Sequence, residues 1–221
     1  MKNDDGVVRA TPQNITKFVN PGSPLPKPEE IFMLSQNLIK CIHDITPKIQ
    51  KTDAWWAIGG DLSEMMGGVS IEATHVEILT NKDGVQKISG ALAEYDPTPI
   101  TTIETKLDRD AEIEGKKYPV RVRSQRMDLT VHGAEVQVHG EYQMKVGEWE
   151  WGDPLEFKAP IVNIVGIRVP VLPIRRSSEL YLTLGWSDRV EKISLAIAHA
   201  HHGRGQYGDE TRSKAYDAQV S

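Results

Sequence analysis

The sequence of 221 residues contains a single cysteine, Cys41, so no disulfide can form within the chain. A lone thiol is typical of proteins in a reducing compartment. The sequence also lacks an apolar run of membrane-spanning length, and its first residues, MKNDDGVVRATPQN, lack the apolar core of a signal peptide. We therefore expect a cytoplasmic protein with no membrane contact.

An excess of positive charge is also missing, because 26 Lys and Arg residues stand against 31 Asp and Glu residues. The net charge of −5 gives no strong signal for nucleic-acid binding, although a local basic patch is not excluded. The composition is that of a globular protein able to bury one sizeable core. We expect one domain over residues 24–202, a flexible arm at 1–23 and a disordered polar tail at 203–221.

The stretch AWWAIGGDLSEMMGGVSIEATHVEILT, residues 54–80, is the most informative part of the sequence. Its apolar start predicts a strand over 54–58, which Gly59 and Gly60 end, and a short helix from Asp61 follows. A glycine turn before a helix lets backbone N–H groups approach an anion, and the helix dipole favours negative charge there. Gly59, Gly60 and Asp61 are therefore predicted to hold a phosphate group.

Two later segments alternate polar and apolar residues, as strands do. In the predicted strand over 74–80, His75 and Glu77 share one face. The longest alternation in the chain predicts that six apolar residues share one face and six polar residues the other. The apolar set is Ala134, Val136, Val138, Tyr142, Met144 and Val146, and the polar set is Glu135, Gln137, His139, Glu141, Gln143 and Lys145.

The strand, Gly-Gly turn, short helix and second strand resemble the nucleotidyltransferase superfamily, which includes DNA polymerase β and small antibiotic and toxin–antitoxin nucleotidyltransferases. The passage GIRVPVLP, residues 166–173, also resembles the strand before their C-terminal helices. The resemblance implies an α/β (α+β) fold, a single nucleotidyltransferase-like domain with a mixed, twisted sheet and packed helices. It further implies a nucleoside triphosphate substrate and Mg²⁺ or Mn²⁺, held by three carboxylates.

The residues at the positions of those three carboxylates are altered. His75 and Glu77 stand where the family has an Asp-x-Asp pair, and Gln137 stands at the third acidic position, with Glu135 and Glu141 as neighbouring substitutes. A neutral imidazole and an amide are poor ligands for Mg²⁺. We therefore expect a protein that has lost standard nucleotidyl transfer and binds a nucleotide or a partner protein.

Two alternatives remain open. In the first, the protein is an active enzyme that moves a nucleotidyl group to an unknown acceptor, with Glu77 anchoring a metal ion and His75 acting as the base. In the second, a transition metal such as Zn²⁺ is bound by His75, Glu77, Glu135 and His139. A structural reading is that these side chains pair with each other and with Arg121 or Arg123.

The remaining sequence predicts further helices and strands around this frame. Apolar spacing predicts a helix that begins at Pro28 and stops at Pro47. A second helix is expected over 84–94, and a strand over 100–106. Helical spacing after residue 176 predicts two C-terminal helices, the first ended by Gly185.

Overall fold

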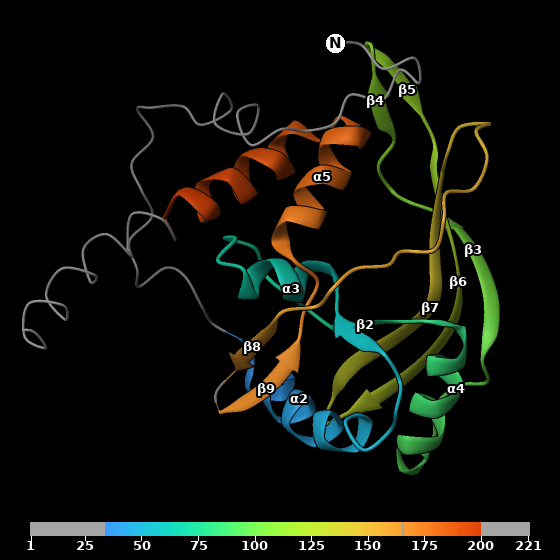
Figure 1. The fold of residues 1–221 in the computed structure, drawn as a ribbon, viewed down its shortest axis with the longest axis vertical. Helices are drawn as coiled ribbons and strands as arrows, with labels where there is room; N and C mark the ends of the chain where they lie inside the picture. Colours follow the sequence, from blue (N-terminus) through green and yellow to red (C-terminus); the bar gives the residue numbers. More distant parts are fainter. Residues whose placement is uncertain (1–33, 165, 200–221) are drawn as a thin grey trace, which may run out of the picture.

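The computed structural model describes residues 34–164 and 166–199 (Figure 1). The predicted arm at 1–23 and tail at 203–221 lie outside these ranges. In chain order the elements are α2 (Gln36–Ile49), β1 (Trp56–Ile58), α3 (Gly60–Met66), β2 (Val76–Thr80), α4 (Lys82–Ala91), η3 (Ala93–Tyr95), β3 (Thr101–Lys106), β4 (Ala111–Ile113), β5 (Lys116–Tyr118), β6 (Val120–Val131), β7 (Ala134–Val146), β8 (Ile161–Ile164), β9 (Ile167–Pro170) and α5 (Ile174–Leu184), followed by a last helix over 187–199.

The centre of the fold is a five-stranded sheet with the order β1-β2-β7-β6-β3. The pair β2–β7 is parallel and the other pairs are antiparallel, so the sheet is mixed. The predicted single α+β domain with a mixed sheet and packed helices is confirmed. No helix within the described ranges is both long and apolar enough to cross a membrane.

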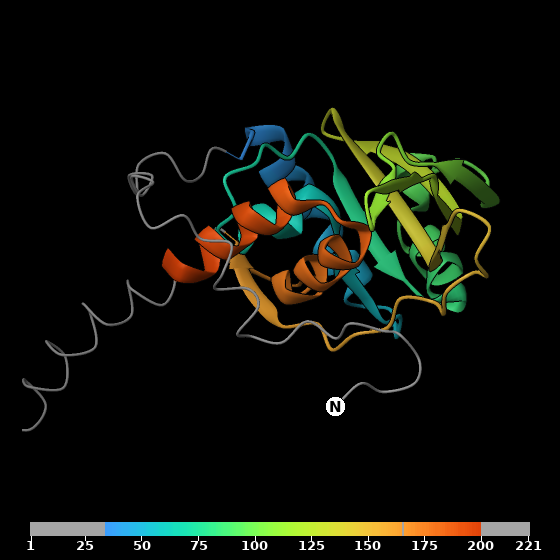
Figure 2. The same ribbon diagram turned by 90° about the horizontal axis from the view of Figure 1, so that it is seen from above.

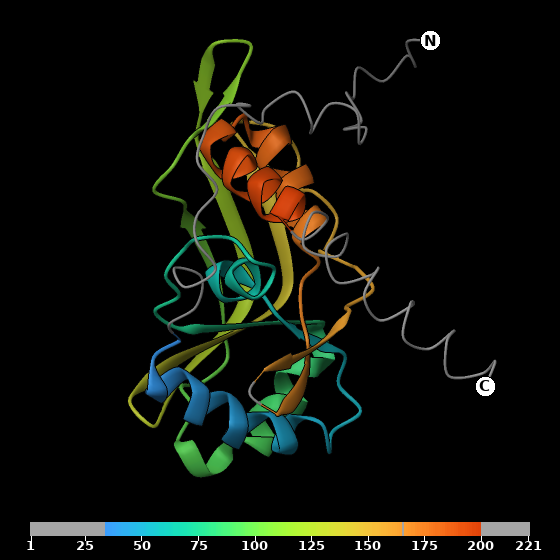
Figure 3. The ribbon, with the colours of Figure 1, turned by 90° about the vertical axis from the view of Figure 1, so that its left-hand side faces the viewer.

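The helices lie on both sides of this sheet (Figures 1 and 3). Helices α2 and α4 belong to one large apolar core together with buried valines of β2 and β7, among them Val76, Val136 and Val138. Helix α5 packs near β6 and β7, the last helix lies farther from these strands than α5 does, and α3 lies below α5 in Figure 1 (Figures 1, 2 and 3). The last helix also packs near α3, since Val69 forms a small core with Ile193 and Ala196.

A β-bulge in β7 divides the sheet into two regions. Gly140 is paired with Gln125 and Gln143 with Arg123, so two residues of β7, Glu141 and Tyr142, face one residue of β6. Glu141 accordingly has a positive φ of 52°. Because one extra residue reverses the direction of every later side chain, the predicted single apolar face is wrong beyond Gly140.

The reversed part of β7 forms a second, smaller core. There Val146 packs with Val120 and with Leu184 and Trp186, which lie at and just after the end of α5. The polar side chains Glu135, Gln137 and His139 of β7 are therefore followed, on the same face of the sheet, by apolar side chains that α5 covers.

The boundaries of helices α2, α4 and α5 differ from the expectation, and α5 begins at Ile174. Helix α2 continues through Pro47 to Ile49, whose side chain is fully buried, and this burial offsets the hydrogen bond that proline cannot donate. Its described start is at Gln36, after the N-cap Ser35, while the predicted start at Pro28 lies outside the described residues. Helix α4 begins at Lys82 because the Asn81 side chain accepts from the Gly84 N–H.

Candidate functional site

The Gly-Gly turn fits directly against Glu77. The Gly59 N–H donates to the Glu77 carbonyl at 2.9 Å, so that N–H is already engaged. Gly60 has a φ of +56°, and a Cβ added there would lie 2.5 Å from Glu77 Oε2. The turn therefore needs glycine because the Glu77 carboxylate occupies the space that a side chain would take.

Three strands bring Glu77, Gln137 and Asp128 into one row. Glu77 of β2 is the register partner of Gln137 on β7, and Gln137 is the partner of Asp128 on β6. Cross-strand partners point to the same face of a sheet. Gln137 thus lies beside Glu77, as the resemblance implied. Asp128 was missed because its strand gave no hint of its register.

The residues around Gln137 form a connected polar network. The Gln137 amide donates to Glu135 at 2.6 Å, so Glu135 lies beside the predicted third acidic position. The Arg126 guanidinium donates to Asp128 at 2.7 Å and lies 4.0 Å from Glu135. We call this polar surface of β2, β7 and β6 the site face.

His75 and His139 border the site face. His75 comes just before β2, and its ring nitrogen lies 3.3 Å from the Thr74 hydroxyl. His139 lies with its Nδ1 2.9 Å from the Ser124 hydroxyl. Burial and the nearby Arg126 guanidinium lower the pKa of His139 to about 4, so its imidazole is neutral at pH 7.

The arginines expected to pair with the site face point elsewhere. Arg121 pairs with the exposed Glu104, and Arg123 donates to Gln143 at 2.8 Å and lies over the Trp151 ring. Both have odd numbers on β6, whereas Arg126 is even and lies on the face of Asp128. The hypothesis that Arg121 or Arg123 holds the histidines and glutamates is wrong, and Arg126 is the cation beside them.

Under Glu77, helix α3 contributes two further carboxylates. Glu64 is only 1% exposed, and it accepts hydrogen bonds from the Tyr181 hydroxyl at 2.5 Å and from Arg189 at 3.2 Å. Arg189 also donates to Asp61 at 3.1 Å. Asp61, predicted only as part of a phosphate site, is thus paired with an arginine of the last helix.

These carboxylates change the acidity of Glu77. Burial, followed by the negative charges of Asp61 and Glu64, raises the pKa of Glu77 to about 7, against the lowering effect of Arg126. At neutral pH the Glu77 side chain is therefore a mixture of the acid and the carboxylate.

Replacing Glu77 by glutamine should make the stability of the protein less dependent on pH. The folded-state pKa of about 7 lies above the ordinary value of 4.5, so the folded protein binds the extra proton and loses stability as pH rises through this window. Above it, Glu77→Gln should exceed the parent by about 2–3 kcal/mol in free energy of unfolding, and below it the two should agree. Urea denaturation from acidic to alkaline pH measures this. The exposed Glu135→Gln is the control, and an equal response of both variants would contradict the prediction.

The comparisons with known proteins support the same frame. No family model matches the chain, and a search of curated proteins finds no match. The structure is similar to that of a presumed nucleotidyltransferase from Thermotoga maritima, with a TM-score of 0.54 and 19% identity over 76% of this chain and 96% of that chain. The chain has the nucleotidyltransferase fold.

Two structures of the antibiotic-resistance factor ANT(2″)-Ia are less similar to the structure of this chain. The crystal structure, in complex with adenylyl-2″-tobramycin, has a TM-score of 0.42 and 11% identity, covering 84% of this chain and 100% of that chain. The solution structure has a TM-score of 0.42 and 10% identity over 84% of this chain and 96% of that chain. Similarity at this level does not inform on the site.

The nucleotidyltransferase fold implies a divalent metal ion, but the side chains at the three predicted acidic positions do not fit Mg²⁺. Two of them, His75 and Gln137, are not carboxylates, and the third, Glu77, is partly protonated at pH 7. Within residues 34–164 and 166–199, no group of three or more His, Cys, Asp or Glu side chains is arranged to hold a metal ion. The zinc hypothesis for His75, Glu77, Glu135 and His139 therefore gains no support from the geometry.

Proposed function

We propose that this protein has lost metal-dependent nucleotidyl transfer and uses the site face to bind a nucleoside triphosphate without turnover. The observation that supports the loss is the register that pairs Glu77 with Gln137, because Gln137, to which the resemblance assigns the third acidic position, is an amide. With Glu77 as the one carboxylate at the three positions, the site lacks the set of three acids that holds two divalent ions in the family.

Binding without turnover requires that the site keep some affinity for phosphate. Arg126 lies on the site face, with 28% of its side chain exposed, and can offer a guanidinium to a phosphate group. A protein partner on the same face is the alternative if no nucleotide binds.

An active enzyme is the second candidate, and the extra carboxylates beside Gln137 favour it. Glu135 and Asp128 lie next to the third acidic position, whereas Glu141, the other predicted substitute, lines a separate cavity. Mg²⁺ or Mn²⁺ would then be held by Glu77 with Glu135 or Asp128. His75 would accept the proton of the acceptor group, since the ordinary pKa of histidine lies near neutrality.

The binding protein and the active enzyme differ in whether a labelled nucleotide is transferred to an acceptor. We expect nucleoside triphosphates to raise the melting temperature, while no labelled nucleotide is transferred to RNA, protein or small-molecule acceptors with either ion. Arg126→Met should abolish the shift, and Arg121→Met on the opposite face should keep it. Transfer that Glu77→Ala abolishes would overturn the proposal in favour of the enzyme. A melting temperature unchanged by every nucleotide would overturn binding.

A further inference from the structure

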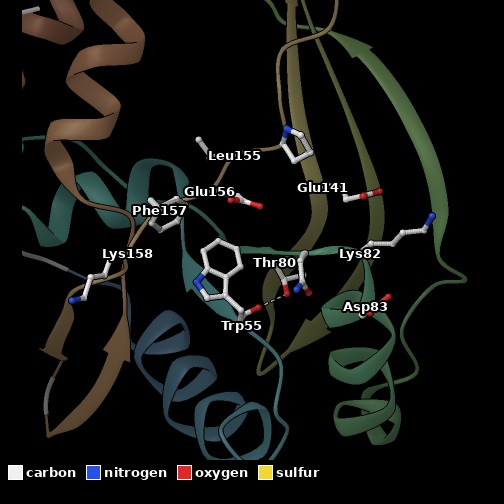
Figure 4. A pocket seen from close by; sticks show the side chains of 11 residues that line it. Trp55, Thr80, Lys82, Asp83, Glu141, Leu155, Glu156, Phe157 and Lys158 are labelled. Atoms are coloured by element: carbon white, nitrogen blue, oxygen red, sulfur yellow. Dashed lines mark hydrogen bonds between the residues drawn. The ribbon is translucent and has the colours of Figure 1, made fainter.

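A cavity lies beside the start of β1 and the end of β2, apart from the site face. Its volume is about 640 Å³, within the range of small-molecule sites. Trp55, the start of α4, Glu141 at the bulge and the segment 154–158 line it (Figure 4). Glu77 and Gln137 are not among its lining residues.

The aromatic wall of this cavity is built by two distant parts of the chain. The rings of Trp55 and Phe157 meet edge to face, with centroids 5.1 Å apart and planes at 71°. The Trp55 carbonyl accepts a hydrogen bond from the Thr80 hydroxyl, which ties the start of β1 to the end of β2. The indole therefore lies against the Phe157 ring and is only partly covered.

The segment 154–158, which carries Phe157, is also tethered, although it has no regular secondary structure. The Leu155 N–H donates to the Tyr142 carbonyl at 2.8 Å, and Arg176 donates to the Glu156 carbonyl at 3.2 Å. These bonds fix the backbone on both sides of the Glu156 side chain. Figure 4 shows its carboxylate between Leu155 and the Trp55 indole.

The charges around the cavity favour a positive ligand near the indole. Three carboxylates line the cavity, those of Asp83, Glu141 and Glu156, against the ammonium groups of Lys82 and Lys158. In Figure 4 both lysine side chains extend away from the indole. The indole thus faces a carboxylate without an ammonium group between them.

We propose that this cavity binds an organic cation, a small molecule whose alkylated ammonium group lies against Trp55 and near Glu156. The face of an indole carries negative potential and attracts such a cation, most strongly where water is partly excluded. The carboxylate of Glu156 adds attraction for the same charge. The inference does not depend on nucleotide binding, because Arg126 and the Gly59–Gly60 turn are not part of this cavity.

Calorimetric titration with choline tests this proposal on the full chain. The control ligand is its uncharged carbon isostere, in which a tert-butyl group replaces the trimethylammonium group. We expect choline to bind and the isostere to bind at least about tenfold more weakly, since only the cation interacts with the indole and the carboxylate. Equal binding of the two ligands, or no binding of choline, would overturn the proposal.

Two variants assign the binding to this cavity. Trp55→Leu should weaken choline binding about tenfold, and Glu156→Gln, an exposed change that leaves the fold intact, should weaken it several-fold. Glu150→Gln removes the same charge from an exposed position outside the cavity and should bind as the parent does. Parent-like binding by Glu156→Gln and Trp55→Leu would place the ligand elsewhere and refute the inference.

Discussion

Replacing Gly60 with alanine should lower the free energy of unfolding by about 2–4 kcal/mol, because two penalties add. The φ of +56° alone costs an L-residue about 1–2 kcal/mol. The new Cβ would also lie 2.5 Å from Glu77 Oε2, so the carboxylate must leave its position against the turn. Urea denaturation at a fixed pH measures the loss.

Two further variants separate these penalties. Gly90→Ala in α4 is the matched control, because its Cβ would meet no heavy atom within 4 Å, and it should stabilise the protein by about 0.5–1 kcal/mol. In Gly60→Ala with Glu77→Ala, the contact is gone and only the backbone penalty remains, so the two changes should not be additive. A Gly60→Ala protein as stable as the parent would show that the turn can relax.

The geometry of this turn gives Gly60 a structural role in place of the predicted role in phosphate binding. A Gly-Gly pair before a helix suggested a phosphate site from the sequence, because glycine permits close approach of an anion. In the structure the anion that approaches Gly60 is the protein's own Glu77 side chain. The glycine is thus required even without a nucleotide, so it supports the fold more directly than it supports nucleotide binding.

The frame of the site could be predicted from local patterns. The strand, turn, helix and strand between residues 54 and 80 form because each has a clear sequence signal, and β1, α3 and β2 are found there. The pairing of Glu77 with Gln137 could not come from periodicity, which gives the face of a residue and not its partner. The family resemblance suggested that Gln137 lies near the first two acidic positions, and the register places it beside Glu77.

The positions of the apolar residues on β6 and β7 indicate the bulge from the sequence alone. On β6 the buried apolar residues are even-numbered at Val120 and Val122 and odd-numbered at Met127 and Leu129. On β7 the apolar residues keep one parity throughout. The buried apolar residues thus change parity along β6 but not along β7. The apolar side chains of the two paired strands can then share a face at both ends only if one strand has an extra residue in the middle, as β7 does near Glu141.

The partner of Glu64 had no such signal. Arg189 is 125 residues later in the chain, and Tyr181 is 117 residues later. A single sequence does not show which residues of distant helices meet, so the cluster under Glu77 was missed. The residue types still fit a rule, because a fully buried carboxylate needs a cation and hydrogen-bond donors.

Removing that cation should have a large effect on stability. We expect Arg189→Met to lower the free energy of unfolding by about 2–4 kcal/mol at pH 7, because it leaves Glu64 buried without its ion-pair partner. The value lies toward the lower end for buried pairs, since 26% of the Arg189 side chain is exposed. Arg121→Met, which breaks the exposed pair with Glu104, should cost less than about 1 kcal/mol.

The pH dependence identifies Glu64 as the cause. Burial already raises the pKa of Glu64, and the loss of Arg189 should raise it further, so Arg189→Met binds a proton that its unfolded state releases. The stability of the variant should then fall more steeply with rising pH than that of the parent, with little difference in acid. Combining it with Glu64→Gln should recover most of the loss at pH 7. If that combination stays as unstable as Arg189→Met alone, the arginine acts through its packing on Tyr181 and not through the buried charge.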